Sequence, residues 1–228
     1  MADIPKLKLV YFDIDGKGEP IRLLLNYLGV EFEDMRFKSR EEFIKMKTDG
    51  TLAFGQVPAL FVGEDAVIVQ SVAILRYIGK LGRHLGFKNL YPEDIIKAAT
   101  VDFIMDFEAD AFTGLRTCKY SARFGFSSDV LTEEAIESTK KTLNAEIIPK
   151  HLTNLQKCLE VSKSGWLADT SDPSIADFYW VPVLDSIVSG WTGDKDLLKN
   201  FPKLQDLQKK FHELEKVAEY RAKKKQKV

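Results

Sequence analysis

A tyrosine near the start of the chain is the first residue whose type could support chemistry. Tyr11 stands at the end of an apolar stretch, Leu7 to Phe12, that has the composition of a short β-strand. A phenol can donate one hydrogen bond to an anionic sulfur. A charge-assisted bond of about 1.5–3 kcal/mol would lower a thiol pKa by roughly two units. Taken alone, however, Tyr11 has the simpler interpretation of a strand tyrosine packed against a core.

A carboxylate on an apolar helical stripe is the second candidate. Asp102 lies in the middle of positions that alternate by three and four residues, which predicts one helical face: Ile95, Ala98, Met105, Ala109 and Phe112. A carboxylate on a packing face needs a partner or a function, because burying it unpaired is costly. The alternative is a surface aspartate beside a wide apolar face.

Two predicted helix starts carry polar residues with different expected roles. Gln70 and Ser71 come at a strand-to-helix junction, where free N–H groups attract anions and where Ser71 can also act as the cap. Ser174 and Asp177 have the spacing of a capping box, with Asp in place of the commoner Glu. We therefore expect Asp177 to be a folding residue.

Other reactive residue types show no useful spacing. The histidines are scattered, and the two cysteines, Cys118 and Cys158, form no CxxC pair. This disfavours a catalytic triad, a structural zinc site and a disulfide framework. The segment Gly16-x-Gly18 is too short for a dinucleotide fingerprint. We expect no metal and no resident cofactor.

The elements that would position these residues fall into two halves. In residues 1–82, strand patterns at 7–12, 30–37, 57–62 and 66–69 alternate with a helix from Pro20 to Gly29, a short amphipathic segment at 40–47 and a hairpin turn at Gly63-Glu64-Asp65. A helix from Ser71 to about Ile78 follows. This order predicts a thioredoxin-like domain at 1–82, with a mixed four-stranded sheet and helices on both faces.

Strand patterns vanish after a linker at 83–92. Helical patterns at 93–117, 132–160, 174–189 and 203–219 predict an all-helical bundle domain at 93–228. The expected fold class is therefore α/β followed by all-α. The basic run at 223–227 is expected to be a solvated, frayed end, with a binding arm as the alternative.

The composition indicates a globular protein of a reducing compartment. The 228 residues are 45% hydrophobic and 29% charged, with a formal net charge of −1. This supplies a core but no basic face for nucleic acid. No apolar run approaches the roughly 18 residues of a membrane span, and the first residues lack the apolar core of a signal peptide. We expect a cytoplasmic protein with no membrane span and no nucleic-acid partner.

Four segments, taken in order, resemble cytosolic glutathione transferases of the tyrosine type: LVYFDIDGKGEPIRLLL at 9–25, FGQVPAL at 54–60, VQSVAILRYI at 69–78 and SIADF at 174–178. The pattern is nearest the sigma class, which includes a prostaglandin D synthase. The resemblance implies a detoxifying enzyme in which Tyr11 activates the glutathione thiol for attack on apolar electrophiles, with a peroxidase or isomerase side activity. The alternative is a non-catalytic structural or assembly protein of the same fold, as in lens crystallins.

The resemblance also assigns residues to the parts of glutathione. Gln70 and Ser71 would hold the γ-glutamyl end, and Lys47 would pair with the glycyl carboxylate. The backbone of Val57, in the segment Gln56-Val57-Pro58 with a cis proline, would pair with the peptide. Asp102 would reach across a homodimer interface to the neighbouring subunit's γ-glutamyl amine.

Three positions depart from the sigma pattern. Lys17 stands where many members have an arginine near the sulfur, and Asp15 replaces another position that is frequently basic. These two departures disfavour prostaglandin isomerisation more than general conjugation. Phe43 stands where the pattern has a tryptophan, so it offers no indole N–H. On the helical half, the second substrate is expected near Phe112, Arg116 and Tyr120.

Overall fold

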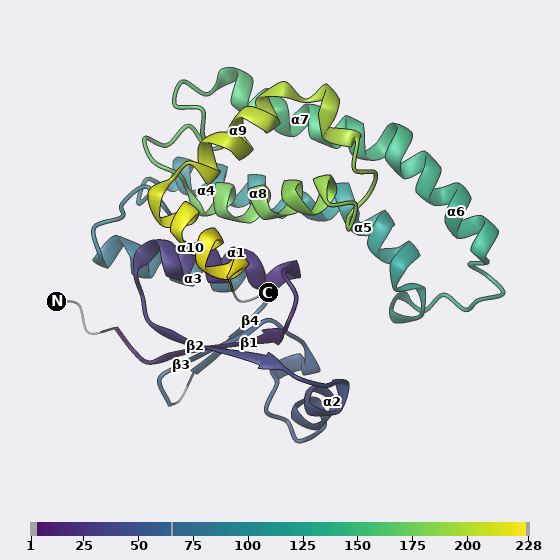
Figure 1. Ribbon diagram of the computed structural model, residues 1–228, viewed down its shortest axis with the longest axis horizontal. Coiled ribbons are helices and arrows are strands. Elements are labelled where there is room, and N and C mark those ends of the chain that lie inside the picture. The colour runs from purple at the N-terminus through teal and green to yellow at the C-terminus, as the bar shows by residue number, and fades with distance from the viewer. Residues whose placement is uncertain (1–3, 65, 227–228) are drawn as a thin grey trace.

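The computed structural model describes residues 4–64 and 66–226, and it has a sheet-containing half and a helical half (Figure 1). The first half contains β1 (Leu7–Phe12), η1 (Gly16–Gly18), α1 (Glu19–Leu28), β2 (Phe32–Phe37), α2 (Arg40–Thr48), η2 (Ala53–Gly55), β3 (Ala59–Val62), β4 (Ala66–Val69) and α3 (Ser71–His84). The strand order is β2-β1-β3-β4, with β1 parallel to β2 and antiparallel to β3, and β3 antiparallel to β4. The predicted thioredoxin-like fold is confirmed.

Local sequence explains most of these elements. β1 is an inner strand covered on both faces, and Leu7, Leu9 and Val10 on it are fully buried. Helix α1 ends at Gly29, whose φ of 69° is the left-handed conformation that favours glycine at a helix end. Helix α3 runs beyond the predicted end because its buried face continues to Gly82. Of the predicted hairpin turn, Asp65 lies outside the described residues.

The second half is all-helical, as predicted. It contains α4 (Ile95–Asp106), α5 (Glu108–Lys119), η3 (Ser121–Phe124), α6 (Glu133–Thr142), the π-helical η4 (Leu143–Ile147), α7 (Ile148–Val161), α8 (Ile175–Val188), η5 (Leu197–Asn200), α9 (Pro202–His212) and α10 (Glu215–Lys225). Within residues 4–64 and 66–226, no helix has both the length and the apolar character needed to cross a membrane.

The predicted single helix over 93–117 is wrong, because the chain breaks at Phe107 into α4 and α5. The stripe predicted from its pattern is correct only in part. Met105 and Phe112 are buried, but Ile95 is 80% exposed, and the other buried residues of α4 are Val101 and Ile104. The predicted helix over 203–219 is likewise two helices, α9 and α10.

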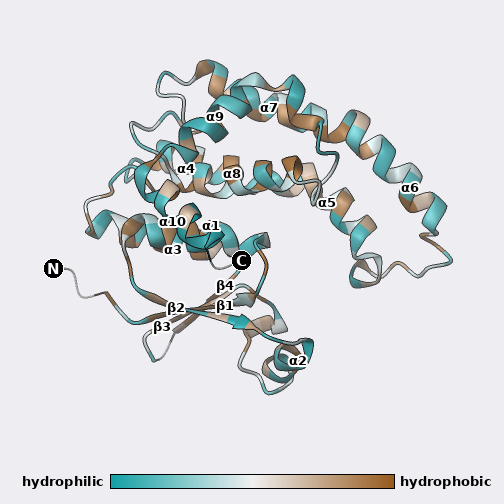
Figure 2. Ribbon diagram, in the orientation of Figure 1, coloured by the Kyte–Doolittle hydropathy of each residue, from teal (hydrophilic) through white to brown (hydrophobic). Residues whose placement is uncertain are grey.

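Helix α8 forms the centre of the helical half, and hydrophobic colouring runs along it in Figure 2, whereas α2 and α10 are mostly hydrophilic. Its capping box is present: the Ser174 hydroxyl accepts from the Ala176 N–H, and the Asp177 carboxylate accepts from the Ser174 N–H at 2.8 Å. Asp177 also accepts from the Leu167 N–H at 2.9 Å. Burial raises the pKa of Asp177 to about 6 despite these hydrogen bonds. The expected folding role of Asp177 is supported by this geometry.

The basic tail is not frayed, contrary to the prediction. Lys223, Lys224 and Lys225 complete α10, which packs beside α1 (Figure 1). The Lys224 ammonium lies 2.8 Å from the Glu19 carboxylate on α1. Lys227, the last lysine of the run, lies outside the described residues.

Candidate functional site

One edge of the sheet collects three of the predicted site residues. A row of paired residues crosses three strands, Val10 on β1, Ala59 on β3 and Val69 on β4. In the sequence, Tyr11 comes directly after Val10, Gln70 directly after Val69, and Pro58 directly before Ala59. Because β3 runs opposite to β1 and β4, these three residues lie at the same edge of the sheet, where β1 and β4 end and β3 begins. Two strand spacings separate Tyr11 from Gln70, which is roughly 10 Å and about the length of three extended residues.

The Tyr11 hydroxyl is held by the loop that follows its own strand. The side chain is 8% exposed, and its oxygen accepts a hydrogen bond from the Lys17 backbone N–H at 3.1 Å. Within the described part of the chain, the Tyr11 O–H itself has no acceptor. The hydroxyl therefore keeps a proton that it can donate to a ligand.

Burial raises the pKa of Tyr11, and the Lys17 N–H and the Arg22 guanidinium only partly oppose this effect. The phenol consequently stays protonated at neutral pH. It is suited to donate a hydrogen bond to an anion rather than to act as a base.

Two glycines leave the space that the Tyr11 ring occupies. A Cβ atom at Gly16 would lie 2.7 Å from the Tyr11 hydroxyl oxygen, and one at Gly18 would lie 2.5 Å from a ring carbon. Both distances are shorter than real contacts, so any side chain at either position would displace the ring. The Gly16-x-Gly18 spacing was therefore informative, although its meaning is close packing on Tyr11 and not a nucleotide loop.

Arg22 supports the same loop from inside α1. It is 1% exposed, and its guanidinium donates to the Ile14 carbonyl at 2.8 Å and the Phe12 carbonyl at 3.2 Å. It also pairs with Asp34 on β2 at 3.0 Å. Sequence reasoning missed this residue, whose signal was a lone arginine within the apolar run of α1.

The Lys17 side chain is bound by the helical half. Its ammonium lies 2.9 Å from the Glu108 carboxylate on α5 and donates to the Tyr179 hydroxyl on α8 at 2.7 Å. Tyr179 donates to Glu108 at 3.0 Å, and Arg116 pairs with the other Glu108 oxygen at 2.8 Å. Glu108 and Tyr179 were not predicted, because nothing in the sequence pairs them with a loop so far away along the chain.

The charged groups of this cluster shift one another's pKa values. Burial raises the pKa of Glu108, but the Lys17 and Arg116 cations outweigh burial and hold it below its ordinary value. Burial lowers the pKa of Lys17, and Glu108 opposes this. The Lys17 ammonium and the Glu108 carboxylate, 2.9 Å apart, form an ion pair in which each charge favours the other.

The segment just before β3 leaves backbone groups open to a ligand. The Val57–Pro58 bond is cis, as the resemblance implied, Pro58 is buried and Gln56 is exposed. The Gln70 side-chain amide lies 3.4 Å from the Gln56 side-chain oxygen. In the described part of the chain, the Val57 N–H and C=O take part in no backbone hydrogen bond.

The start of α3 differs from the prediction in one respect. The cap position belongs to Gln70, and Ser71 is the first helical residue, so the predicted Ser71 cap is wrong. No side chain in the described part of the chain caps this end. Gln70 has φ 71° and ψ 117°, a conformation that is strained for a residue other than glycine. The first N–H groups of α3 are left free to receive an anion.

Helix α2 presents a lysine beside this edge. Phe43 packs on Phe12 and Phe37, with ring centroids 5.1 and 5.6 Å away, and so has a packing role. Lys47 is exposed, its aliphatic stem lies against Gly55, and it makes no ion pair with the described residues. Its ammonium is thus available to a carboxylate.

Asp102 has partners within its own chain. One carboxylate oxygen accepts from Arg76 at 2.6 Å, and the other accepts from the Tyr91 hydroxyl at 2.9 Å. The sequence argument required a partner or a function for this carboxylate, and the partner is a neighbouring arginine. The role of Asp102 towards the γ-glutamyl amine of a second subunit was implied by the resemblance, and it stays a prediction.

Comparisons with known proteins agree with this architecture. The glutathione S-transferase N-terminal domain model matches residues 7–80, and the C-terminal domain model of the same family matches residues 125–224. A glutathione S-transferase of Anopheles gambiae is 31% identical, over 96% of this chain and 97% of the relative. Glutathione S-transferase 1 of Ascaris suum is 35% identical, over 90% and 95%.

A solved structure is similar over nearly the same extent. Prostaglandin synthase D of Nilaparvata lugens is 28% identical and aligns with a TM-score of 0.79, covering 96% of this chain and 98% of that one. The chain belongs to the glutathione S-transferase family, and its reaction is the transfer of an organic group to the sulfur of glutathione. Among the described residues, no group of three side chains is placed to hold a metal ion.

Proposed function

We propose that the Tyr11 hydroxyl donates its hydrogen bond to the sulfur of glutathione and stabilises the thiolate. The observation that supports this most directly is the Lys17 N–H bond, which occupies the phenol oxygen as an acceptor and leaves its proton free. The thiolate is the nucleophile, and a free thiol with a pKa of about 8.5 is little ionised at neutral pH. One charge-assisted bond of about 1.5–3 kcal/mol has the size needed to correct this.

The rest of glutathione extends along the sheet edge. The γ-glutamyl carboxylate binds at Gln70 and Ser71, where the α3 N–H groups are uncapped. The peptide pairs with the free backbone groups of Val57, and the glycyl carboxylate reaches Lys47. The roughly 10 Å between Tyr11 and Gln70 is compatible with an extended tripeptide.

The second substrate is an apolar electrophile, as in a detoxifying enzyme nearest the sigma class. Large apolar side chains are exposed in the loop after Tyr11 and at the end of α5, where Ile14 is 46% and Tyr120 is 47% exposed. Phe112, also expected there, is 1% exposed in the core, and Arg116 is engaged by Glu108. Tyr120 therefore stays a candidate, and the other two have structural partners.

Replacement of Tyr11 by Phe tests this role. We expect turnover with a chloronitrobenzene to fall by roughly 10- to 100-fold, which corresponds to the loss of one charge-assisted bond. Glutathione affinity should change little, because the phenol acts mainly on the ionised sulfur. The same panel should include a hydroperoxide and a prostaglandin endoperoxide, to reveal side activities. Equal turnover by wild type and Tyr11→Phe would rule the role out.

A homodimer completes the proposal. Phe54 is 81% exposed, and Ile96 and Phe103, seven residues apart on one face of α4, are 71% and 58% exposed. Sedimentation should show a dimer in wild type and a shift towards monomer in Phe103→Ser. Val161 is 79% exposed on α7, so Val161→Ser provides a matched control. A wild-type monomer at all concentrations would contradict the dimer. The cytoplasmic location stays a prediction.

A further inference from the structure

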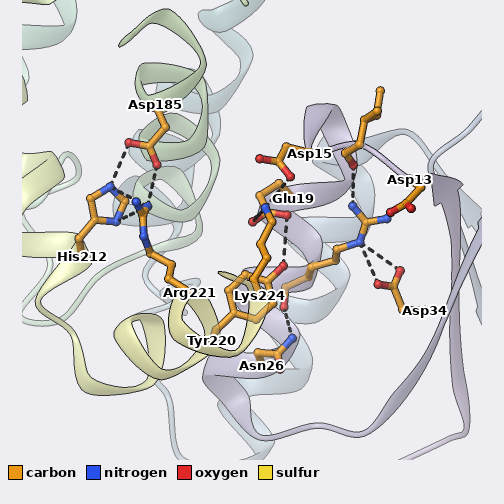
Figure 3. A network of polar contacts seen from close by, with 12 residues as sticks. Asp13, Asp15, Glu19, Asn26, Asp34, Asp185, His212, Tyr220, Arg221 and Lys224 are labelled. Atoms are coloured by element: carbon orange, nitrogen blue, oxygen red, sulfur yellow. Dashed lines mark hydrogen bonds and ion pairs between the residues drawn. The ribbon is translucent and has the colours of Figure 1, made fainter. Parts of the chain in front are cut away.

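The C-terminal helix α10 is tied to Glu19, the first residue of α1, and to Asp15 in the preceding loop through three polar contacts (Figure 3). The Lys224 ammonium lies between the carboxylates of Asp15 and Glu19, at 2.8 Å from the latter. The Tyr220 hydroxyl donates to the other Glu19 oxygen at 3.1 Å. Glu19 is 7% exposed, so its carboxylate depends on these two partners.

A second group of contacts anchors α10 to the helical half. Arg221 donates to the Asp185 carboxylate on α8 at 3.1 Å and to the His212 ring, which itself lies 3.0 Å from Asp185. Figure 3 shows this group on the other side of α10 from Lys224. The helix therefore bridges α8 and α1, which belong to different halves of the molecule.

The point where Lys224 acts is the loop that holds Tyr11. The Asp15 carbonyl accepts from the N–H groups of Gly18 and Glu19, at 3.1 and 2.8 Å, and so shapes the short turn between them. Within that turn lies the Lys17 N–H that donates to the Tyr11 hydroxyl. A shift of Asp15 would move this donor and the ring packed between the two glycines.

We propose that α10 is a strap and that Lys224 is a positioning residue: by bridging Asp15 and Glu19 it holds the loop that aims the Tyr11 hydroxyl at sulfur. This inference rests on the proposed role of Tyr11. It also accounts for Asp15, whose negative charge lies in the loop that holds Tyr11 and is balanced by the Lys224 cation on α10.

The test is the pKa of the thiol of enzyme-bound glutathione, followed by ultraviolet absorbance of the thiolate, together with the pH profile of kcat/KM. In Lys224→Met we expect the thiol pKa to rise and turnover at neutral pH to fall roughly two- to fivefold, the size of a partly exposed ion pair. The KM for glutathione should stay nearly unchanged, because the binding residues lie elsewhere. Lys224→Arg should restore both values.

Lys223→Met is the matched control, since Lys223 is exposed on the same helix and has no ion-pair partner among the described residues. The proposal would be overturned by an equal change in thiol pKa and turnover in Lys223→Met, or by an unchanged thiol pKa in Lys224→Met. Thermal unfolding of both variants shows whether the helical half stays folded.

A double variant separates positioning from a direct charge effect. If Lys224 acts through Tyr11, then Lys224→Met should cost little further turnover in a Tyr11→Phe background. The same factor in both backgrounds would overturn the proposal, because a charge acting directly on the thiolate does not need the phenol. Failure of the Tyr11 role itself would instead appear as normal turnover in Tyr11→Phe alone.

Discussion

The two ends of the sheet edge that carries the site are built in opposite ways. At the Tyr11 end, the ring is buried, the hydroxyl oxygen has a donor, and the neighbouring loop is held by Arg22, Lys17 and Lys224. At the other end, Lys47 and Gln56 are exposed and Lys47 makes no ion pair with the described residues.

This difference teaches how the two ends contribute to catalysis. A hydrogen-bond donor stabilises a developing or bound anion best when it is already oriented, because no energy is then spent on ordering it. Other groups bind the ligand equally well in the ground state and in the transition state. Such groups can be ordered by the ligand itself, and they affect KM more than kcat. The comparison therefore predicts costly changes in stability and turnover at the Tyr11 end, and modest changes in affinity at the Lys47 end.

Glu108→Gln should have the largest effect, because it removes the anion that pairs with both Lys17 and Arg116. Glu108 has 7% of its side chain exposed, whereas Lys17 and Arg116 have 33% and 30%. We expect a loss of about 2–3 kcal/mol in the free energy of unfolding, somewhat below the about 3–5 kcal/mol of a fully buried broken pair. Chemical denaturation measures it. Glu137→Gln, which removes an exposed pair with Lys140 on α6, should cost less than about 0.5 kcal/mol.

The same variant should change the response to acid. The pKa of Glu108 is held below its ordinary value in the folded protein, so its contribution to stability is present above the unfolded pKa of about 4.3 and is lost as pH falls through the folded pKa. Wild type should therefore lose more stability than Glu108→Gln between about pH 5 and pH 3. Parallel curves in this range would show that Glu108 is not stabilised by its cations.

Gly18→Ala should have the next largest effect, and it separates turnover from stability. Its Cβ would lie 2.5 Å from a Tyr11 ring carbon, so the ring or the loop must move. We expect a destabilisation of about 1–3 kcal/mol from overpacking, together with a fall in kcat. Gly114→Ala in α5 creates a similar overlap, 2.6 Å from Leu143, away from Tyr11. A comparable loss of kcat in Gly114→Ala would show that general strain, and not the position of Tyr11, is the cause.

The sequence predicted what depends on neighbouring residues. The strand at 7–12, the end of α1 at Gly29 and the capping box at Ser174 all follow from local patterns, and each is present. The resemblance placed Tyr11, Pro58 and Gln70 in one site, and strand pairing brings them to one edge. Local signals are sufficient there because a regular strand or helix leaves few choices for the next residue.

The sequence could not predict contacts between distant segments. Lys17 meets Glu108, and Lys224 meets Asp15, only because the two halves pack together, and no periodic pattern records such a pairing. The helix break at Phe107 and the exposure of Ile95 were not marked by the helical pattern, and the pattern did not name Arg76 as the partner of Asp102. A charged residue in an otherwise apolar segment, such as Arg22, marks a buried contact without naming its partner.

Lys47→Met should have the smallest effect, and it tests the exposed end of the comparison. Lys47 lies in the open with no ion-pair partner in the described part of the chain, so its removal should leave stability within about 0.5 kcal/mol of wild type. Pairing with a ligand carboxylate near the surface is worth up to about 1 kcal/mol, which is roughly a two- to fivefold rise in the KM for glutathione. Turnover at saturation should be unchanged, because the lysine contacts glutathione equally before and during the reaction.

Lys45→Met on the same helix removes an equal charge and should leave KM unchanged. A fall in kcat for Lys47→Met would contradict the proposed difference between the Tyr11 end and the Lys47 end of the site, because it would mean that the exposed Lys47 end also helps to orient the sulfur.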